Sequence, residues 1–157
     1  MNDHPNLPRT RSGNPPRHRL ALPAPRLVPH PRVPLPNFRR ADIIALRSDG
    51  GFACIEIKSG LRDFQTDAKW PEYRDYADAL YFAVDEDFPA ALLPEDTGLI
   101  VACGQEADLI RESPAHPLPS ARRRALLHRF AVLAAQRLAT RDDPAGTASL
   151  RAALLVE

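Results

Sequence analysis

Ala41-Asp-Ile-Ile-Ala-Leu46 and Phe52-Ala-Cys-Ile-Glu-Ile-Lys58 are two runs of β-forming residues, separated by the short polar segment Arg47-Ser-Asp-Gly-Gly51. A connection of this length that contains glycine is typical of a β-hairpin. Successive side chains of a strand point to opposite faces, so Glu56 and Lys58 share one face and the isoleucines of the second run share the other. The isoleucines predict a sheet that packs on at least one side.

The residues after the hairpin predict further strands and helices. Proline is tolerated in a first helical turn, so a helix is expected to begin near Pro71. Ser120 is the expected N-cap of a helix that runs to Thr140. Three apolar runs are expected to be strands: residues 80–84, 98–103 and 107–111. This order predicts an α/β fold, with a mixed sheet flanked by helices.

Composition excludes several classes of protein. The formal net charge is only +1, so a nucleic-acid site would depend on local basic clusters rather than on an overall field. Cys54 and Cys103 form no metal-binding CxxC pair and lie in apolar runs, so both are expected to be buried and reduced. The apolar runs are far shorter than the roughly 20 residues that span a bilayer. We therefore expect a cytoplasmic protein without a membrane segment.

Asp42, Glu56 and Lys58 are the candidate catalytic set. The predicted hairpin can bring Asp42, at the start of its strand, close to Glu56. Two carboxylates suit Mg²⁺, a hard cation that prefers oxygen ligands and keeps several waters. The lysine can orient a water molecule or offset charge on a phosphodiester oxygen. The alternative is a solvated strand face, because a Glu-x-Lys triplet occurs by chance in many proteins.

Two sets of residues carry a resemblance to known nucleases. Arg39-Arg-Ala-Asp42 followed by Ile55-Glu-Ile-Lys-Ser59 resembles the PD-(D/E)XK superfamily, whose fold is restriction-endonuclease-like. Residues 33–138 as a whole resemble the MmcB family of bacterial DNA repair proteins. The segments that narrow the resemblance to this family are Asp67-Ala-Lys-Trp-Pro-Glu-Tyr-Arg-Asp-Tyr76, Leu80-Tyr-Phe-Ala-Val84, Leu93-Pro-Glu-Asp-Thr-Gly-Leu-Ile-Val101 and Pro117-Leu-Pro-Ser-Ala-Arg-Arg123.

The resemblance implies a nuclease of DNA repair that hydrolyses DNA phosphodiester bonds with Mg²⁺, or with Mn²⁺ in its place. Asp42, Glu56 and the main-chain carbonyl of Ile57 would bind the metal, and Lys58 would assist the attacking water. Because many nucleases of this superfamily cut as dimers, a homodimer is left open. An inert DNA-binding or scaffold protein that keeps the fold is the alternative function, and an α/β protein with no role on nucleic acid is a third.

Five residues are predicted to contact DNA. Arg39 and Arg40 lie beside the first carboxylate and Arg62 follows the lysine strand, so all three could hold phosphates. Lys69 and Tyr73 have the spacing of the Gln-x-x-x-Tyr motif of some nucleases of this superfamily, with lysine in place of glutamine.

Other polar and aromatic residues are given structural roles. Trp70 is expected to pack in the core rather than stack on a base. Asp63 and Asp67 are expected to be solvated or capping carboxylates. Arg122-Arg-Arg124 opens the last helix, the end where the helix dipole disfavours cations. This placement mildly supports a bound anion, but a solvated face is the commoner outcome for such arginines and remains the main expectation.

Residues 1–36 differ from the rest of the chain. They hold ten of the 17 prolines, and Asp3 is their only acidic residue. Because such proline spacing disfavours helices and paired strands, we expect a disordered Pro/Arg-rich arm, a nuclease-like domain over 37–140 and a tail over 141–157. The helix that opens such nuclease folds is therefore expected to be missing. Two explanations are open: a genuine tail that tethers DNA, or a mistranslated stretch.

Overall fold

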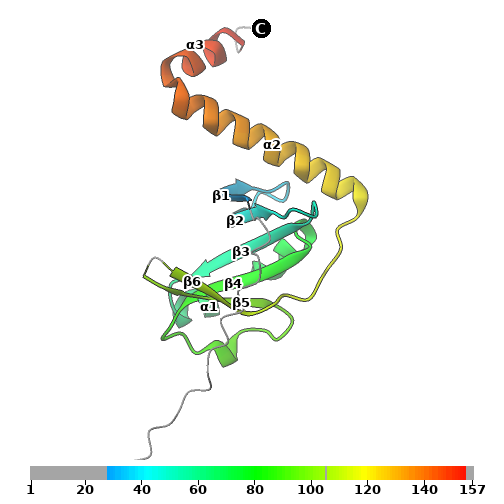
Figure 1. The fold of residues 1–157 in the computed structure, drawn as a ribbon, viewed down its shortest axis with the longest axis vertical. Helices are drawn as coiled ribbons and strands as arrows, with labels where there is room; N and C mark the ends of the chain where they lie inside the picture. Colours follow the sequence, from blue (N-terminus) through cyan, green and yellow to red (C-terminus); the bar gives the residue numbers. More distant parts are fainter. Residues whose placement is uncertain (1–27, 105, 155–157) are drawn as a thin grey trace, which may run out of the picture.

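Six strands form one mixed sheet in residues 28–104 and 106–154, the part of the chain that our computed structural model describes. They are β1 (Val28–Pro34), β2 (Arg40–Leu46), β3 (Phe52–Lys58), β4 (Ala79–Asp85), β5 (Gly98–Cys103) and β6 (Glu106–Arg111). Their order in the sheet follows the chain. The β3–β4 and β4–β5 pairs are parallel, and the other pairs are antiparallel. The predicted mixed α/β fold is confirmed (Figure 1).

The helical segments lie between and after the strands. They are α1 (Leu61–Thr66), α2 (Ser120–Asp142), α3 (Pro144–Leu154) and the 3₁₀ helices η1 (Trp70–Tyr76) and η2 (Ala90–Leu92). Ser120 is the first residue of α2 and Pro119 takes the N-cap place, so the predicted cap is wrong by one residue. The predicted tail contains α3. Among the described residues no helix is long and apolar enough to cross a membrane.

The predicted β2–β3 hairpin is confirmed. Its strands pair from Ile43 opposite Ile55 to Leu46 opposite Phe52. The turn closes where the Arg47 N–H donates to the Gly51 carbonyl at 2.8 Å. Gly50 within this turn has φ of 80°, a left-handed conformation that favours glycine.

Strand β1 contradicts the prediction that the prolines of residues 1–36 prevent a paired strand. Pro29 and Pro31 lie in β1, with Ala45 and Ile43 of β2 opposite. β1 is the edge of the sheet, where proline is tolerated because every second N–H points away from the partner strand. Val33 of β1 is fully buried, so this part of the predicted arm belongs to the domain. Residues 1–27 lie outside the described residues, and so do the predictions of disorder and of a missing opening helix for this part of the chain.

The sheet packs mainly on the face that carries the charged residues of β3. Phe52 and Cys54 on this face lie in one buried cluster with Phe130 of α2, and the two phenylalanine rings meet edge-on with centroids 6.0 Å apart. Glu56 is buried on the same face, whereas Ile57 on the other face is 51% exposed. The isoleucine face is therefore the less covered one, contrary to what its apolar side chains indicate.

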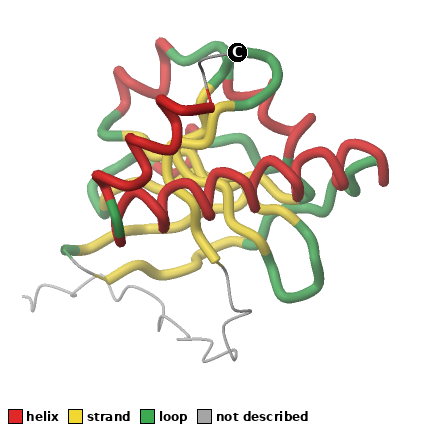
Figure 2. Tube along the Cα trace, turned by 90° about the horizontal axis from the view of Figure 1, so that it is seen from above, coloured by secondary structure: helices red, strands yellow, loops and turns green. Residues whose placement is uncertain are grey.

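Helix α2 lies across the β1 edge of the sheet and extends beyond it, as Figure 2 shows from above. Leu126 and Phe130 are the buried residues of α2. Both belong to its first half, so that half is anchored to the domain. Of the two cysteines, Cys54 is buried as predicted. Cys103 is exposed because it ends β5 beside the turn to β6.

Candidate functional site

Asp42 and Glu56 meet where the pairing of β2 and β3 ends. The Asp42 N–H donates to Glu56 Oε1 at 3.2 Å, and the Ile57 N–H donates to Asp42 Oδ2 at 3.0 Å. Each carboxylate thus takes the place of a main-chain acceptor of the neighbouring strand. The structure therefore brings the two predicted carboxylates together. Asp42 Oδ1 and Glu56 Oε2 accept no hydrogen bond from the described residues.

Burial changes the acidity of Glu56, whose exposed fraction is 4%. Loss of water around the charged form raises its pKa to about 7, and the nearby charge of Asp42 acts in the same direction. The hydrogen bond from the Asp42 N–H and the charge of Lys58 act against this rise. The Cys54 thiol lies 3.8 Å from Glu56 Oε1, and burial raises the pKa of this thiol well above its usual value. A cation beside Glu56 would favour its ionised form.

Lys58 forms an ion pair with Asp67, in the segment that connects α1 to η1. Both side chains are largely buried, with exposed fractions of 4% and 18%. Burial acts to raise the pKa of Asp67, but the hydrogen bonds from Lys58 Nζ and the Lys69 N–H outweigh it and lower the pKa. Lys58 is therefore held in place by Asp67 on the face of β3 that carries Glu56, and its charge acts to lower the pKa of Glu56.

The sequence did not identify Asp67 as part of the site. Its predicted capping role is confirmed, since Asp67 Oδ1 accepts the Lys69 N–H at 2.9 Å, but its other oxygen binds Lys58. Asp63 accepts hydrogen bonds from the Ser59 N–H and hydroxyl, as expected of a capping residue. The only sequence signal for Asp67 is its place just after the short helix that follows the lysine strand.

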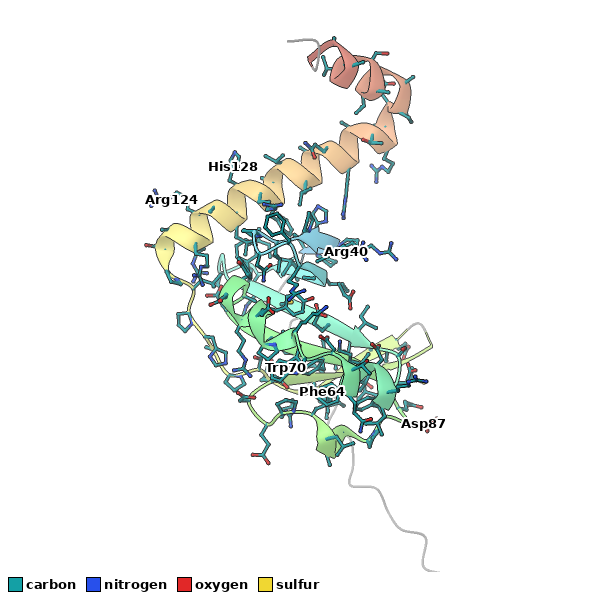
Figure 3. All side chains as sticks on the ribbon, turned by 180° about the vertical axis from the view of Figure 1, so that it is seen from behind. Arg40, Phe64, Trp70, Asp87, Arg124 and His128 are labelled. Carbon is teal, nitrogen blue, oxygen red and sulfur yellow. The ribbon has the colours of Figure 1, made fainter. Side chains whose placement is uncertain are left out.

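The basic residues predicted to contact DNA differ in their partners. Arg39 forms a bidentate ion pair with Glu72, at 3.1 and 3.0 Å. Arg40, Arg62 and Lys69 are exposed and form no ion pair with the described residues, and Figure 3 shows Arg40 reaching away from the sheet.

Tyr73 is buried, and its hydroxyl donates to the Arg40 carbonyl at 3.3 Å. Lys69 precedes η1 and is exposed. Because a 3₁₀ helix has three residues per turn, residues four apart do not share a face. The structure therefore does not align Lys69 with Tyr73 as the α-helical motif would.

Similarity to known proteins agrees with the resemblance to the MmcB family found in the sequence. The family described as DNA repair protein MmcB-like matches residues 18–145. The chain belongs to this family. This MmcB-like chain is also 40% identical to the SPO1766 protein of unknown function from Silicibacter pomeroyi, with a TM-score of 0.72. That likeness covers 76% of this chain and 82% of the other. None of the curated proteins compared with the MmcB-like chain matches it.

The aromatic and arginine residues outside the carboxylate pair have structural partners in the MmcB-like chain. Trp70 packs edge-on against Phe82 with centroids 5.4 Å apart, which confirms its packing role (Figure 3). Two of the three arginines at the start of α2 bind carboxylates: Arg122 binds Asp75 and Arg123 binds Asp78, at 3.0 and 2.7 Å. These carboxylates offset the unfavourable charge at the helix start, and Arg124 points away from the sheet (Figure 3).

A divalent cation fits the donors that the MmcB-like chain offers. No group of three or more His, Cys, Asp or Glu side chains suited to a metal is found among the described residues. Mg²⁺ needs fewer, because it keeps several waters and is usually bound through one or two carboxylates. The oxygens of Asp42 and Glu56 that accept no hydrogen bond, with the carbonyl of Ile57, would serve as its protein ligands.

Proposed function

We propose that this MmcB-like protein hydrolyses DNA phosphodiester bonds with Mg²⁺ bound by Asp42 and Glu56, with Mn²⁺ as a substitute. The observation that carries the proposal is the buried Glu56 carboxylate paired with Asp42 across two strands. Keeping two neighbouring carboxylates ionised in a protein interior costs free energy unless a cation balances their charge. The raised pKa of Glu56 reflects this cost. The family is a DNA repair family, which supports DNA as the substrate.

Each residue of the site has a distinct task under this proposal. When bound, Mg²⁺ would lower the pKa of a water molecule and polarise the phosphoryl group. Asp42 and Glu56 fix the place of the cation, because each is tied to the neighbouring strand. Lys58 holds a positive charge beside them. Its ammonium is largely buried and bound by Asp67, so it acts on the water or phosphate at the carboxylates rather than reaching out along the DNA.

A cleavage assay tests the proposal. We expect the full chain to cut branched, single-stranded or duplex DNA in Mg²⁺ or Mn²⁺, and not in a metal chelator. Glu56→Gln and Lys58→Ala should lose at least 100-fold in rate, on the order of a lost metal ligand or catalytic group. Glu95→Gln is the matched control, because Glu95 is an exposed carboxylate in the loop before β5. It should cut at the wild-type rate.

The second candidate function is an inert DNA-binding or scaffold protein. The observation that favours it is the ion pair of Lys58 with Asp67, in which the Lys58 side chain is only 4% exposed. Wild-type protein that binds DNA but cuts it with neither metal would select this function. The homodimer stays a prediction, which sedimentation of the full chain tests.

A further inference from the structure

Phe38 is a fully exposed aromatic residue on the turn between β1 and β2, with an exposed fraction of 101%. Its φ is 63°, a left-handed conformation that bulky side chains rarely adopt and that glycine or asparagine adopts more easily. The ring therefore adds no buried surface to the folded state, and glycine or asparagine at this position would make the folded state more stable. A role outside the folding of the domain accounts for both features.

Hydrogen bonds fix the turn that carries Phe38. The Leu35 N–H donates to the Arg39 carbonyl at 2.7 Å, and the Phe38 N–H donates to the Leu35 carbonyl at 3.1 Å. Asn37 Oδ1 accepts the Arg39 N–H at 3.2 Å. Glu72 of η1 then binds the side chains of both Asn37 and Arg39, at 3.3 Å and at 3.1 and 3.0 Å. The ring is thus presented to solvent from a backbone that is held to η1.

The turn lies close to the carboxylate pair along the chain. Phe38 is four residues before Asp42, which places the two Cα atoms at most about 14 Å apart. A strand advances about 3.4 Å per nucleotide along a duplex axis and further when it is unpaired, so this reach corresponds to at most about four nucleotides. Arg40 lies between the two and is exposed, and it forms no ion pair within the described residues (Figure 3). A ring, a cation and a carboxylate site therefore follow one another on one segment.

The surroundings of the ring favour a nucleic acid over a protein partner. A protein-docking patch has apolar neighbours around its aromatic anchor. The chain neighbours of Phe38 within two positions are instead mostly polar: Pro36, Asn37, Arg39, which is paired with Glu72, and Arg40, which forms no ion pair with the described residues. An exposed aromatic ring beside an exposed cation is an arrangement on which unpaired bases stack while the cation contacts a phosphate, and Arg40 is that cation here.

We propose that Phe38 stacks on an unpaired base of the DNA strand that passes Asp42, so that the substrate is single-stranded or locally unpaired DNA. This rests on the proposed function, because it places the strand at the carboxylates. Bases inside an intact duplex offer no free face to the ring. Stacking would be tolerant of sequence, because every base has a π-face.

Fluorescence anisotropy of the full chain without divalent metal tests this proposal. The probes are a labelled mixed-sequence 15-nucleotide single strand and its duplex. Phe38→Ala should weaken single-strand binding roughly tenfold, the effect typical of one stacked base, and should change duplex binding less than twofold. Phe38→Tyr should keep wild-type affinity. Leu92→Ala is the control, because Leu92 is another exposed apolar side chain, with an exposed fraction of 51%.

Three outcomes would overturn the stacking role: equal single-strand affinity of wild type and Phe38→Ala, an equal loss on the duplex, or loss of a bound partner protein with unchanged DNA affinity. Cleavage by the same preparations in Mg²⁺ separates the two proposals. Binding that depends on Phe38 without any cleavage supports the stacking surface and contradicts hydrolysis. Cleavage that is unaffected by Phe38→Ala on single strands supports hydrolysis and contradicts stacking.

Discussion

The main-chain N–H of Asp42 donates to Oε1 of Glu56 across the β2–β3 pair, at 3.2 Å. The Ile57 N–H donates in return to Asp42 Oδ2 at 3.0 Å. Two carboxylates therefore replace main-chain acceptors at the place where the hairpin stops pairing. Each carboxylate has one oxygen tied to the backbone and one that no described residue binds.

Glu56→Gln should stabilise the metal-free protein at high pH. Glu56 has its pKa raised from 4.5 to about 7, so the folded state takes up a proton more readily than the unfolded state between these values. Stability therefore falls as pH rises through this window, by up to roughly 3 kcal/mol. Glutamine carries no charge and keeps the acceptor for the Asp42 N–H.

Urea denaturation in a metal chelator measures this effect. At pH 8 the variant should be more stable than wild type by roughly 1–3 kcal/mol, and the gap should close towards pH 4.5. Glu95→Gln should match wild type at both values. A wild type that is as stable as Glu56→Gln at pH 8 contradicts the raised pKa.

The sequence predicted the neighbourhood of Asp42 and Glu56 because that neighbourhood is local. A five-residue turn and the two-residue period of a strand are enough to bring them together. Predictions that depended on contacts between residues far apart in the sequence were less accurate. Which face of β3 is buried depends on where Phe130 of α2 packs, and α2 lies far along the chain. No pattern within residues 52–58 predicts that contact.

Two further features were missed for physical reasons. Proline density correctly disfavours strands within a sheet, but it does not exclude an edge strand, and β1 lies at the edge. Asp67 was read as a capping residue because one of its oxygens is one. Its other oxygen binds Lys58 because α1 turns the chain back towards β3. The spacing of Lys58 and Asp67 in the sequence does not predict this contact.

Asp67→Asn should destabilise the protein through Lys58. Asparagine can keep the acceptor for the Lys69 N–H, so a purely capping role predicts almost no change. Without the carboxylate, however, the buried ammonium of Lys58 has lost its counter-charge, which costs roughly 3 kcal/mol. The free energy of unfolding in urea distinguishes the two roles.

The matched control is Asp63→Asn, a neighbouring exposed carboxylate that binds Ser59 and not a lysine. This variant should lose less than about 1 kcal/mol. Equal losses in the two variants would mean that Lys58 does not depend on Asp67.

Asp78→Asn should loosen α2 from the sheet. Its two oxygens accept the Phe52 N–H at 2.7 Å and the Leu118 N–H at 2.8 Å, and both bind Arg123 of α2. Burial acts to raise the pKa of Asp78, but these donors outweigh it and lower the pKa, so the stabilisation is lost as pH falls below about 4. The expected cost of the substitution near pH 7 is roughly 2–4 kcal/mol.

Hydrogen exchange of α2 amides, together with urea denaturation, measures this loosening. Asp75→Asn is the control, because Asp75 pairs with Arg122 at the exposed surface and such pairs contribute less than about 1 kcal/mol. Faster exchange confined to α2 and its junction is expected for Asp78→Asn. Unchanged exchange would contradict the anchoring role of Asp78.

Calorimetric titration with Mg²⁺ near pH 6, in two buffers of different protonation enthalpy, tests most directly whether Asp42 and Glu56 form a metal site. With a pKa of about 7, Glu56 is mostly protonated near pH 6 and must release its proton to bind the cation. We predict one Mg²⁺ per chain, with close to one proton released near pH 6 and almost none near pH 9. Asp42→Asn and Glu56→Gln should abolish the binding. Wild-type protein that binds no Mg²⁺, or binds it as tightly in both variants, would contradict the account.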